Sequence, residues 1–272
     1  MSQIEKPKAD VGSVKNVADV LKLVSQWHTD QKIVDPGVCN RVWYRGHSKR
    51  TYLIEPGVYR PEFTKRALDI YGKGIEDKRL NLERETLSEF RRSGAALLNR
   101  DNLEEMYFIA QHYGISTRLL DWTTNPLAAL FFAACSNHGE DGDIFVMDAK
   151  TVILSSKGPG IPKGIMTMSH PYAVDAIRPS YWIKPKEVRP PLILPILPDN
   201  LPGRIGQQSS CFTMHMQGSE DCNSATVGCI LVNGKSKADI LAELRRLNLN
   251  QFTVFGTLDH LAKEIRSVWK LL

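Results

Sequence analysis

The amino-acid sequence predicts an α+β fold, because helical apolar periods dominate its first half and strand-like segments dominate its second half. No segment repeats along the chain. The length of 272 residues suffices for one large domain or two small ones. We place a single domain at residues 16–272, after a flexible, polar N-terminus at residues 1–15.

The composition is that of an ordinary globular protein, with 42% hydrophobic and 24% charged residues. No run of about 18 apolar residues is present, which argues against a membrane span and a membrane partner. Residues 1–15 lack the apolar core of a signal peptide, and the five cysteines are odd in number without C-x-x-C spacing. We therefore expect a cytoplasmic protein with reduced thiols, and the net charge of +5 permits a polyanionic partner.

Apolar residues recur at helical spacing in the first half of the chain. This period predicts three helices, at Val17–Trp27, Glu83–Leu98 and Leu103–His112. The apolar stripe of the second helix consists of Leu87, Phe90, Leu97 and Leu98.

A short strand is predicted between the first two of these helices. Val42, Trp43 and Tyr44 are β-preferring residues, and Arg45 with Gly46 ends the strand. Gly46 permits either a turn or the close approach of a ligand. Arg45 belongs either to a cleft or sheet edge, or to a salt bridge with a neighbouring carboxylate.

Residues 110–134 combine a polar loop with an apolar helix. Asn125 is a preferred N-cap, Pro126 suits the first helical position, and Leu127–Cys135 is apolar on every side. We expect this helix to be buried, with the preceding loop held against the core. Because stray polar groups are costly there, the loop is either a fully satisfied structural unit or a binding site. Its polar and aromatic residues are Ser116, Thr117, Arg118, Asp121, Trp122 and Thr123.

Strand-like segments follow in the second half. Residues 151–206 hold ten of the fifteen prolines, so we expect an extended, proline-rich insertion without regular helix. Strands are predicted at Asp143–Met147, within residues 204–215, and at Val227–Val232.

Two helices are predicted at the C-terminal end. Ser236 caps the first, which spans Lys237–Leu247. The second starts at Thr257 or Asp259. Its apolar residues are expected to face inward: Leu261, Ile265, Val268 and Trp269.

Several common kinds of active site are absent from the sequence. No histidine pair has metal-ligand spacing, and His112 is more typical of a hydrogen-bonded core residue. The sequence has no Gly-x-Ser-x-Gly elbow, phosphate loop or dinucleotide-fold glycine motif. Arginine can hold a phosphate, small hydroxyls can orient a neighbouring group, and glutamine can donate and accept. Three polar clusters therefore remain as candidates: Tyr44–Gly46, Ser116–Arg118 and the pair Gln207–Gln208.

Longer motifs join these clusters. They are Tyr44-Arg45-Gly46-His47, Ala110-Gln-His-Tyr-Gly, Thr117-Arg-Leu-Leu-Asp-Trp-Thr, Asn125-Pro-Leu-Ala-Ala-Leu-Phe-Phe-Ala, Arg204-Ile-x-x-Gln208 and Phe255-Gly-Thr-Leu-Asp. Together they resemble the FRG domain family over about residues 16–270. Ser116 stands where that family usually has proline, and Ser210 where glycine is common.

A more distant similarity extends to ADP-ribosyltransferases, which carry an arginine on a first strand, a Ser-Thr-Ser strand before a helix, and a late Glu or Gln. Arg45, Ser116–Thr117 and Gln208 follow this order, although Arg118 replaces the third serine and the Glu is absent. The similarity implies an ADP-ribosyltransferase-like split-sheet core with N- and C-terminal helices. It also implies NAD as a substrate, bound in the cleft between two small sheets.

The same similarity implies roles for individual residues. In the catalytic set of Arg45, Thr117 and Gln208, the arginine holds the adenosine or diphosphate, the threonine fixes the nicotinamide ribose, and the glutamine orients the acceptor. An aromatic residue would stack on the nicotinamide, and no metal is implied. The residues implied to bind NAD are Tyr44, Arg45, Gly46, His47, Tyr113, Ser116, Thr117, Arg118, Asp121 and Trp122.

The implied function is NAD-dependent ADP-ribosyl transfer to a macromolecular acceptor, by a toxin of phage defence that an antitoxin neutralises. Because Gln208 lacks the charge of Glu, a nucleic acid (RNA or DNA), a hydroxyl or water is favoured as acceptor over a protein arginine. A carboxylate can supply that charge if the fold brings one near, the candidates being Glu85, Glu104, Glu105 and Asp121. Asp121 is equally suited to pair with Arg118 or Arg45. The alternative is a non-catalytic FRG module that binds nucleic acid or protein.

Overall fold

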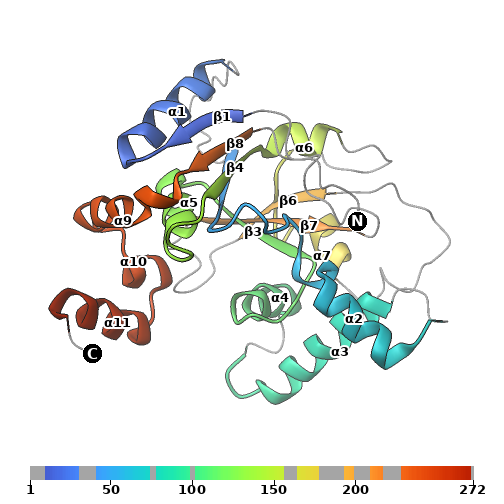
Figure 1. Ribbon diagram of the computed structural model, residues 1–272. Coiled ribbons are helices and arrows are strands. Elements are labelled where there is room, and N and C mark those ends of the chain that lie inside the picture. The colour runs from blue at the N-terminus through green and yellow to red at the C-terminus, as the bar shows by residue number, and fades with distance from the viewer. Residues whose placement is uncertain are drawn as a thin grey trace.

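The computed structural model describes residues 10–30, 41–73, 78–98, 102–155, 164–177, 193–198, 209–216 and 228–270. Within these residues the chain forms one eight-stranded sheet and ten α-helices, which confirms the α+β class (Figure 1). The strand order is β1-β8-β4-β2-β3-β7-β6-β5. In this part of the chain, no helix is long and apolar enough to cross a bilayer.

The sheet consists of two four-stranded halves that meet at one position. The first half contains β1 Asp10–Val14, β8 Gly228–Val232, β4 Gly142–Asp148 and β2 Val42–His47. The second contains β3 Leu119–Thr123, β7 Ser210–His215, β6 Ile193–Leu197 and β5 Met166–Thr167. β2 pairs with β4 at six positions, and β3 pairs with β7 at five. β2 and β3, in contrast, pair only at Tyr44 and Thr123.

Helices cover one face of this sheet in two groups. The group on the first half includes α1 Val17–Asp30, α5 Pro126–Ala134, α9 Lys237–Arg246 and α10 Gln251–Phe255. The group on the second half includes α3 Lys78–Ser93, α4 Leu103–His112 and α7 Pro171–Ile177. Tyr44 belongs to the apolar core beneath the first group of helices and is paired with Thr123. Thr123 lies on the same side of β3 as Leu119, which belongs to the apolar core beneath the second group. Both helical groups therefore lie on one face, with the junction between them.

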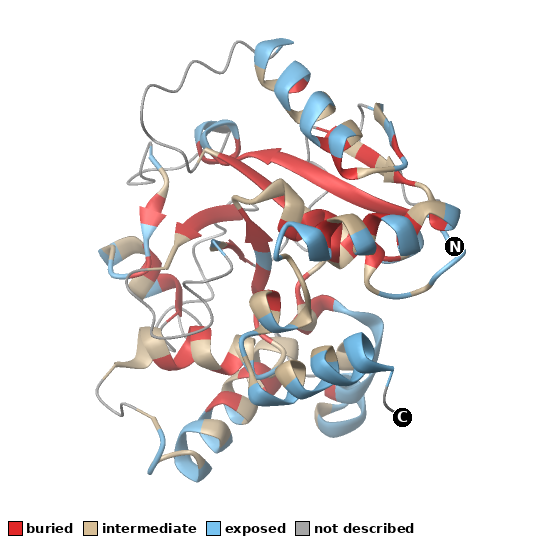
Figure 2. Cartoon of the chain, turned by 90° about the vertical axis from the view of Figure 1, so that its left-hand side faces the viewer, coloured by how far each residue is buried: buried red, intermediate tan, exposed pale blue. Residues whose placement is uncertain are grey.

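A third apolar cluster covers the opposite face and spans both halves. Trp43 and Phe145 come from the first half, and Leu120 and Trp122 from the second. α6 Ala149–Ser155 contributes Ala149 and Val152 to this cluster and Ile153 to the core of the second half. Most of the sheet is consequently buried between layers, as Figure 2 shows in red.

Local sequence signals predict two helices of the helical face correctly. α4 has the predicted bounds, and α5 begins at Pro126 as predicted. The Asn125 side chain caps α5 by accepting hydrogen bonds from the backbone N–H groups of Leu127 and Ala128. α1 begins at the predicted residue and continues to Asp30.

Gly46 lets α5 lie directly on β2. A Cβ atom at this position would overlap the carbonyl oxygen of Ala129 and lie 2.7 Å from the backbone nitrogen of Ala133. Only glycine leaves room for the helix backbone. Instead of ending the strand, Arg45 and Gly46 lie inside β2, because pairing with β4 continues to His47.

Other strands also form where the local sequence predicted none. Residues 119–123 form β3 instead of a loop, because they pair with β7 along their whole length. Asp10–Val14 belonged to the predicted flexible N-terminus, but these residues pair with β8. Such pairing joins residues far apart in the sequence, so short-range periodicity does not reveal it.

The proline-rich segment contains regular helix, contrary to prediction. α6 extends to Ser155, and α7 spans Pro171–Ile177. Pro171 is the first residue of α7, a position where the missing N–H is harmless. β5 and β6 are the extended segments of this region that the structure describes.

The outer helices differ from prediction at their ends and in orientation. α3 ends at Ser93, and Leu97 is exposed beyond it. Ser236 makes no capping hydrogen bond to α9, because residues 234–236 form a 3-10 turn capped by Asn233. Thr257 caps α11 Leu258–Trp269 as predicted.

The predicted inward orientation of α11 is wrong. None of its residues is buried, and Ile265, Val268 and Trp269 are 47%, 56% and 73% exposed. α11 packs chiefly on α10 at the edge of the molecule, away from the sheet (Figure 1). Its apolar side chains consequently remain at the surface.

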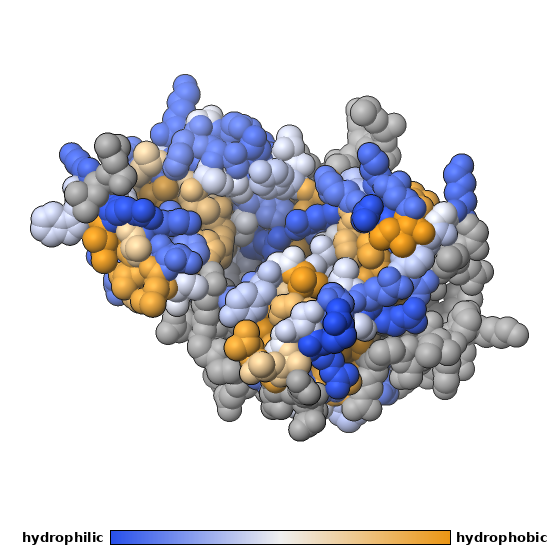
Figure 3. Space-filling model, turned by 90° about the horizontal axis from the view of Figure 1, so that it is seen from below, coloured by the Kyte–Doolittle hydropathy of each residue, from blue (hydrophilic) through white to orange (hydrophobic). Residues whose placement is uncertain are grey.

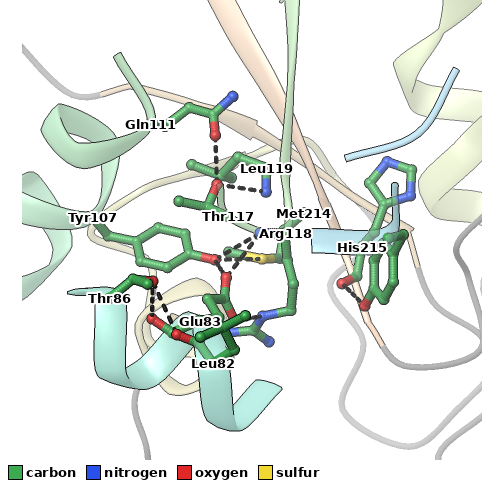
Figure 4. A network of polar contacts seen from close by, with 11 residues as sticks. Leu82, Glu83, Thr86, Tyr107, Gln111, Thr117, Arg118, Leu119, Met214 and His215 are labelled. Atoms are coloured by element: carbon green, nitrogen blue, oxygen red, sulfur yellow. Dashed lines mark hydrogen bonds and ion pairs between the residues drawn. The ribbon is translucent and has the colours of Figure 1, made fainter. Parts of the chain in front are cut away.

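The short 3-10 helix η1 Gly57–Tyr59 and helix α2 Pro61–Tyr71 both pack on α3. Helix α3 also carries Glu83, the acidic partner of a buried ion pair. Glu83 of α3 accepts hydrogen bonds from the backbone N–H and from Nε of Arg118, at 2.8 and 2.9 Å (Figure 4). The hydroxyl of Tyr107 in α4 donates to the same carboxylate.

This ion pair is inaccessible to solvent, since Glu83 is 0% and Arg118 1% exposed. Burial acts to lower the pKa of Arg118, but the charge of Glu83 raises it above its ordinary value, so the guanidinium stays charged. Glu83, rather than the predicted Asp121, is the ionic partner of Arg118. The pair fixes the start of β3 to α3 and α4.

Replacing Glu83 by Gln should lower the free energy of unfolding by about 3–5 kcal/mol, because the Arg118 guanidinium then stays buried without a counter-ion. Urea denaturation followed by circular dichroism measures this loss. Glu89→Gln on the same helix is the matched control, since the Glu89–Arg92 pair lies at the surface and its removal should change little. Equal losses in both variants would contradict the anchoring role of Glu83.

Candidate functional site

A cavity of about 320 Å³ lies where β2 and β3 separate. Seen from below, the surface is hollowed between the part built by α10 and α11 and the part built by α3 and α4 (Figure 3). The cavity is lined from both halves of the sheet and from the helices beside the junction. Its lining residues are Tyr44, Arg45, Gly46, Gln111, His112, Asp121, Trp122, Thr123, Phe132, Ser210 and Phe255.

Arg45 reaches from β2 to β3 at this junction. Its Nε donates a hydrogen bond to Nε2 of His47 at 2.9 Å, and its Nη1 donates to the backbone carbonyl oxygen of Asp121 at 2.6 Å. These bonds hold the guanidinium in the cavity wall. Of the two predicted environments, the structure therefore places Arg45 in a cleft, where its permanent charge suits an anionic ligand.

His47 orients Arg45 and is neutral at physiological pH. Its ring is buried edge-on against Phe145, with ring centroids 5.0 Å apart. Burial, and next the charge of Arg45, lower the pKa of His47 to about 3. Nε2 can therefore accept the hydrogen bond from Arg45. His47 does not itself line the cavity.

Asp121 brings a carboxylate to the same cavity. Its Oδ2 accepts a hydrogen bond from Nε2 of Gln111 at 2.7 Å. Oε1 of Gln111 accepts in turn from the hydroxyl of Thr117 at 2.6 Å. Arg45 and Asp121 thus both line this cavity, and Thr117 is joined to it through Gln111.

The aromatic lining divides into fixed and accessible rings. Tyr44 and Trp122 are buried, with the Tyr44 hydroxyl 3.0 Å from Nε2 of His28, and Nε1 of Trp122 donating to Thr213. Phe132 of α5 and Phe255 of α10 are only partly buried. Phe255 already stacks on the ring of His260, with centroids 4.3 Å apart, and one face at most is left for a flat ligand.

The structure brings together five of the residues that the sequence analysis assigned to NAD binding, namely Tyr44, Arg45, Gly46, Asp121 and Trp122. Others lie elsewhere: Arg118 is buried with Glu83, Ser116 packs against Gly57, and Tyr113 is exposed beyond α4. Gln207 and Gln208 lie outside the described residues. Ser210, two positions further on, lines the cavity.

Sequence reasoning missed four cavity residues and misread a fifth. Gln111 and His112 lie in the motif Ala110-Gln-His-Tyr-Gly, but the sequence analysis takes its candidates from the polar loop that follows. It interprets His112 as a core residue. Phe132 belongs to an all-apolar helix, in which no pattern separates a cavity residue from a core residue. Phe255 and Ser210 reach the cavity through long-range packing alone.

The low pKa of His47 predicts a loss of stability in acid. A histidine titrates near 6.5 in the unfolded chain and His47 near 3 in the folded protein, so between these values the unfolded state binds more protons. The contribution is complete above pH 6.5 and is lost as the pH falls toward 3, by at most about 1.4 kcal/mol per pH unit. In chemical denaturation between about pH 7 and pH 5, His47→Gln should show a shallower loss than the wild type. Parallel pH dependences would count against this account.

The comparisons with known proteins agree with the sequence motifs. Residues 40–142 match the family model of the FRG domain. No curated protein and no solved structure matches the chain. The matched span contains every cavity residue except Ser210 and Phe255. The resemblance predicted from the motifs is therefore confirmed over residues 40–142, which match the FRG domain family.

Proposed function

We propose that this protein is an NAD-consuming ADP-ribosyltransferase whose active site is the cavity at the β2–β3 junction. One observation carries the proposal: Arg45 and Asp121, joined by a hydrogen bond from Nη1 of Arg45 to the backbone carbonyl of Asp121, both line a single cavity. NAD combines an anionic diphosphate with a glycosidic carbon that becomes cationic as nicotinamide leaves. The two side chains complement these two charges.

The shape and lining of the cavity support this substrate. A volume of about 320 Å³ is comparable with one nucleoside, which suits the reacting end of a dinucleotide. Phe132 and Phe255 offer aromatic faces for a nicotinamide ring. Arg45 would then hold the diphosphate at the junction, with His47 maintaining its orientation.

Catalysis at such a site rests on positioning and electrostatics. The bond between nicotinamide and ribose breaks with its electron pair moving to the positively charged nicotinamide ring, which leaves as a neutral molecule. The developing charge on the ribose is stabilised by preorganised negative or polar groups, as Asp121 would provide. No covalent intermediate with the enzyme is required.

We propose a nucleophilic acceptor rather than a protein arginine, because a protonated guanidinium is a poor nucleophile and Gln208 carries no charge that would hold it. We propose nucleic acid, RNA in particular, as the macromolecular acceptor, consistent with the net charge of +5. We further propose that the protein is a toxin of phage defence neutralised by an antitoxin. The toxin role and its neutralisation by an antitoxin are proposed from the similarity to ADP-ribosyltransferase toxins.

Purified protein incubated with NAD labelled in its ADP-ribose part should release nicotinamide and transfer label to RNA, DNA or protein. Arg45→Ala should weaken NAD binding by about 10- to 100-fold, since hydrogen bonds to charged groups contribute about 1.5–3 kcal/mol. Calorimetry measures the dissociation constant. Tyr113→Ala should bind as the wild type does, because Tyr113 is exposed and lies outside the cavity lining.

Two outcomes would oppose the proposal. Unchanged NAD affinity in Arg45→Ala would show that Arg45 does not hold the diphosphate at the junction. Absence of nicotinamide release and of transferred label in every acceptor pool would favour the alternative, a non-catalytic FRG module that binds a macromolecule through the same cavity.

Expression in bacteria tests the toxin role separately. The wild type should slow growth, and Arg45→Ala or Gln208→Ala should relieve the defect. Growth inhibition that persists undiminished in both variants would show that the toxicity, if present, arises elsewhere in the protein.

A further inference from the structure

We infer that Asp121 is the catalytic carboxylate of this site and that Thr117 and Gln111 are positioning residues that hold it. The inference rests on the proposed function and assigns the charge that the sequence lacks at Gln208. Of the four candidate carboxylates, Asp121 lines the cavity, whereas Glu85, Glu104 and Glu105 do not.

The hydrogen bonds leave one consistent orientation for these side chains. Oγ1 of Thr117 accepts from the backbone N–H of Leu119 at 3.0 Å, so its own proton is available to Oε1 of Gln111 (Figure 4). Because Oε1 accepts, the Gln111 amide must turn its NH₂ group toward Asp121. The backbone of β3 thus fixes a threonine hydroxyl, the hydroxyl fixes an amide, and the amide fixes a carboxylate.

One oxygen of Asp121 remains available for chemistry. Oδ2 accepts from Gln111, whereas Oδ1 has no hydrogen-bond partner among the residues that the structure describes. The backbone carbonyl of Asp121 accepts from Nη1 of Arg45, so the same residue also anchors the guanidinium at the junction. Asp121 is solvent-accessible, and an acceptor can therefore reach it.

The step assigned to Asp121 is proton transfer coupled to substitution at the ribose carbon. The glycosidic bond to nicotinamide breaks, and its electron pair stays on the nicotinamide nitrogen. An acceptor hydroxyl, amine or water forms the new bond to the same carbon, and its proton passes to Asp121 and then to solvent. General base catalysis of this kind contributes about 10²- to 10⁴-fold.

This assignment gives Thr117 a different role from the one that the sequence similarity implied. Its side chain is fully buried, and its hydroxyl is hydrogen-bonded to Leu119 and Gln111, so it does not reach a substrate directly. Removal of its hydroxyl should therefore impair turnover through a misplaced carboxylate, with substrate affinity retained.

The test measures kcat and KM for nicotinamide release from NAD, together with NAD affinity by calorimetry. Asp121→Asn should lower kcat by at least about 100-fold while KM and affinity stay within a few-fold of the wild type. Thr117→Val should lower kcat by about 10-fold, and Thr117→Ser, which restores a hydroxyl, should recover most of the loss. Gln111→Met removes the amide but keeps Thr117 and its bond to Leu119, and it should reproduce the effect of Thr117→Val even if the latter folds poorly.

The outcomes separate this inference from the proposed function. If the wild type turns over NAD and Asp121→Asn does so equally fast, Asp121 is not the catalytic carboxylate, although the proposed function stands. If Asp121→Asn is impaired but Gln111→Met and Thr117→Val are not, the positioning roles are overturned. If the wild type neither binds nor cleaves NAD, the proposed function fails and this inference falls with it.

Discussion

The cavity exists because β2 and β3 share a single paired position. At Tyr44 and Thr123 the two halves of the sheet are joined, and beyond this point they diverge. The cluster around Trp43 and Trp122 holds the halves together on the opposite face. On the helical face the cores remain separate, so the gap at the junction is left for polar side chains and for the cavity.

Each polar group at the junction depends on an interaction outside it. Arg45 is directed by a histidine that burial keeps neutral, and Asp121 is directed by Gln111. The start of β3 is in turn fixed by the Glu83–Arg118 ion pair. A buried ion pair of this kind adds little net stability, but it selects one arrangement, since every alternative leaves a charge unsatisfied.

The sequence was informative where local chemistry decides the structure. The Asn125 cap, Pro126 and the period of α4 specify two helices, and the motifs contain Arg45 and Asp121, which both line the cavity. β1 and β3 could not be predicted, because their stability comes from partner strands distant in the sequence. The partner of Arg118 lies 35 residues away on helix α3, so no spacing rule could identify Glu83. Phe132 was hidden by the uniform apolar character of α5.

The contact of Gly46 with α5 has a meaning for the Tyr-Arg-Gly motif itself. The glycine is required by the crossing of a helix backbone over a strand, and any larger residue would force the two apart. The arginine beside it answers to a separate demand, the chemistry of the junction. A chain without any activity would still need the glycine to keep this packing. The glycine of the motif is therefore explained by architecture alone, whereas the arginine is not.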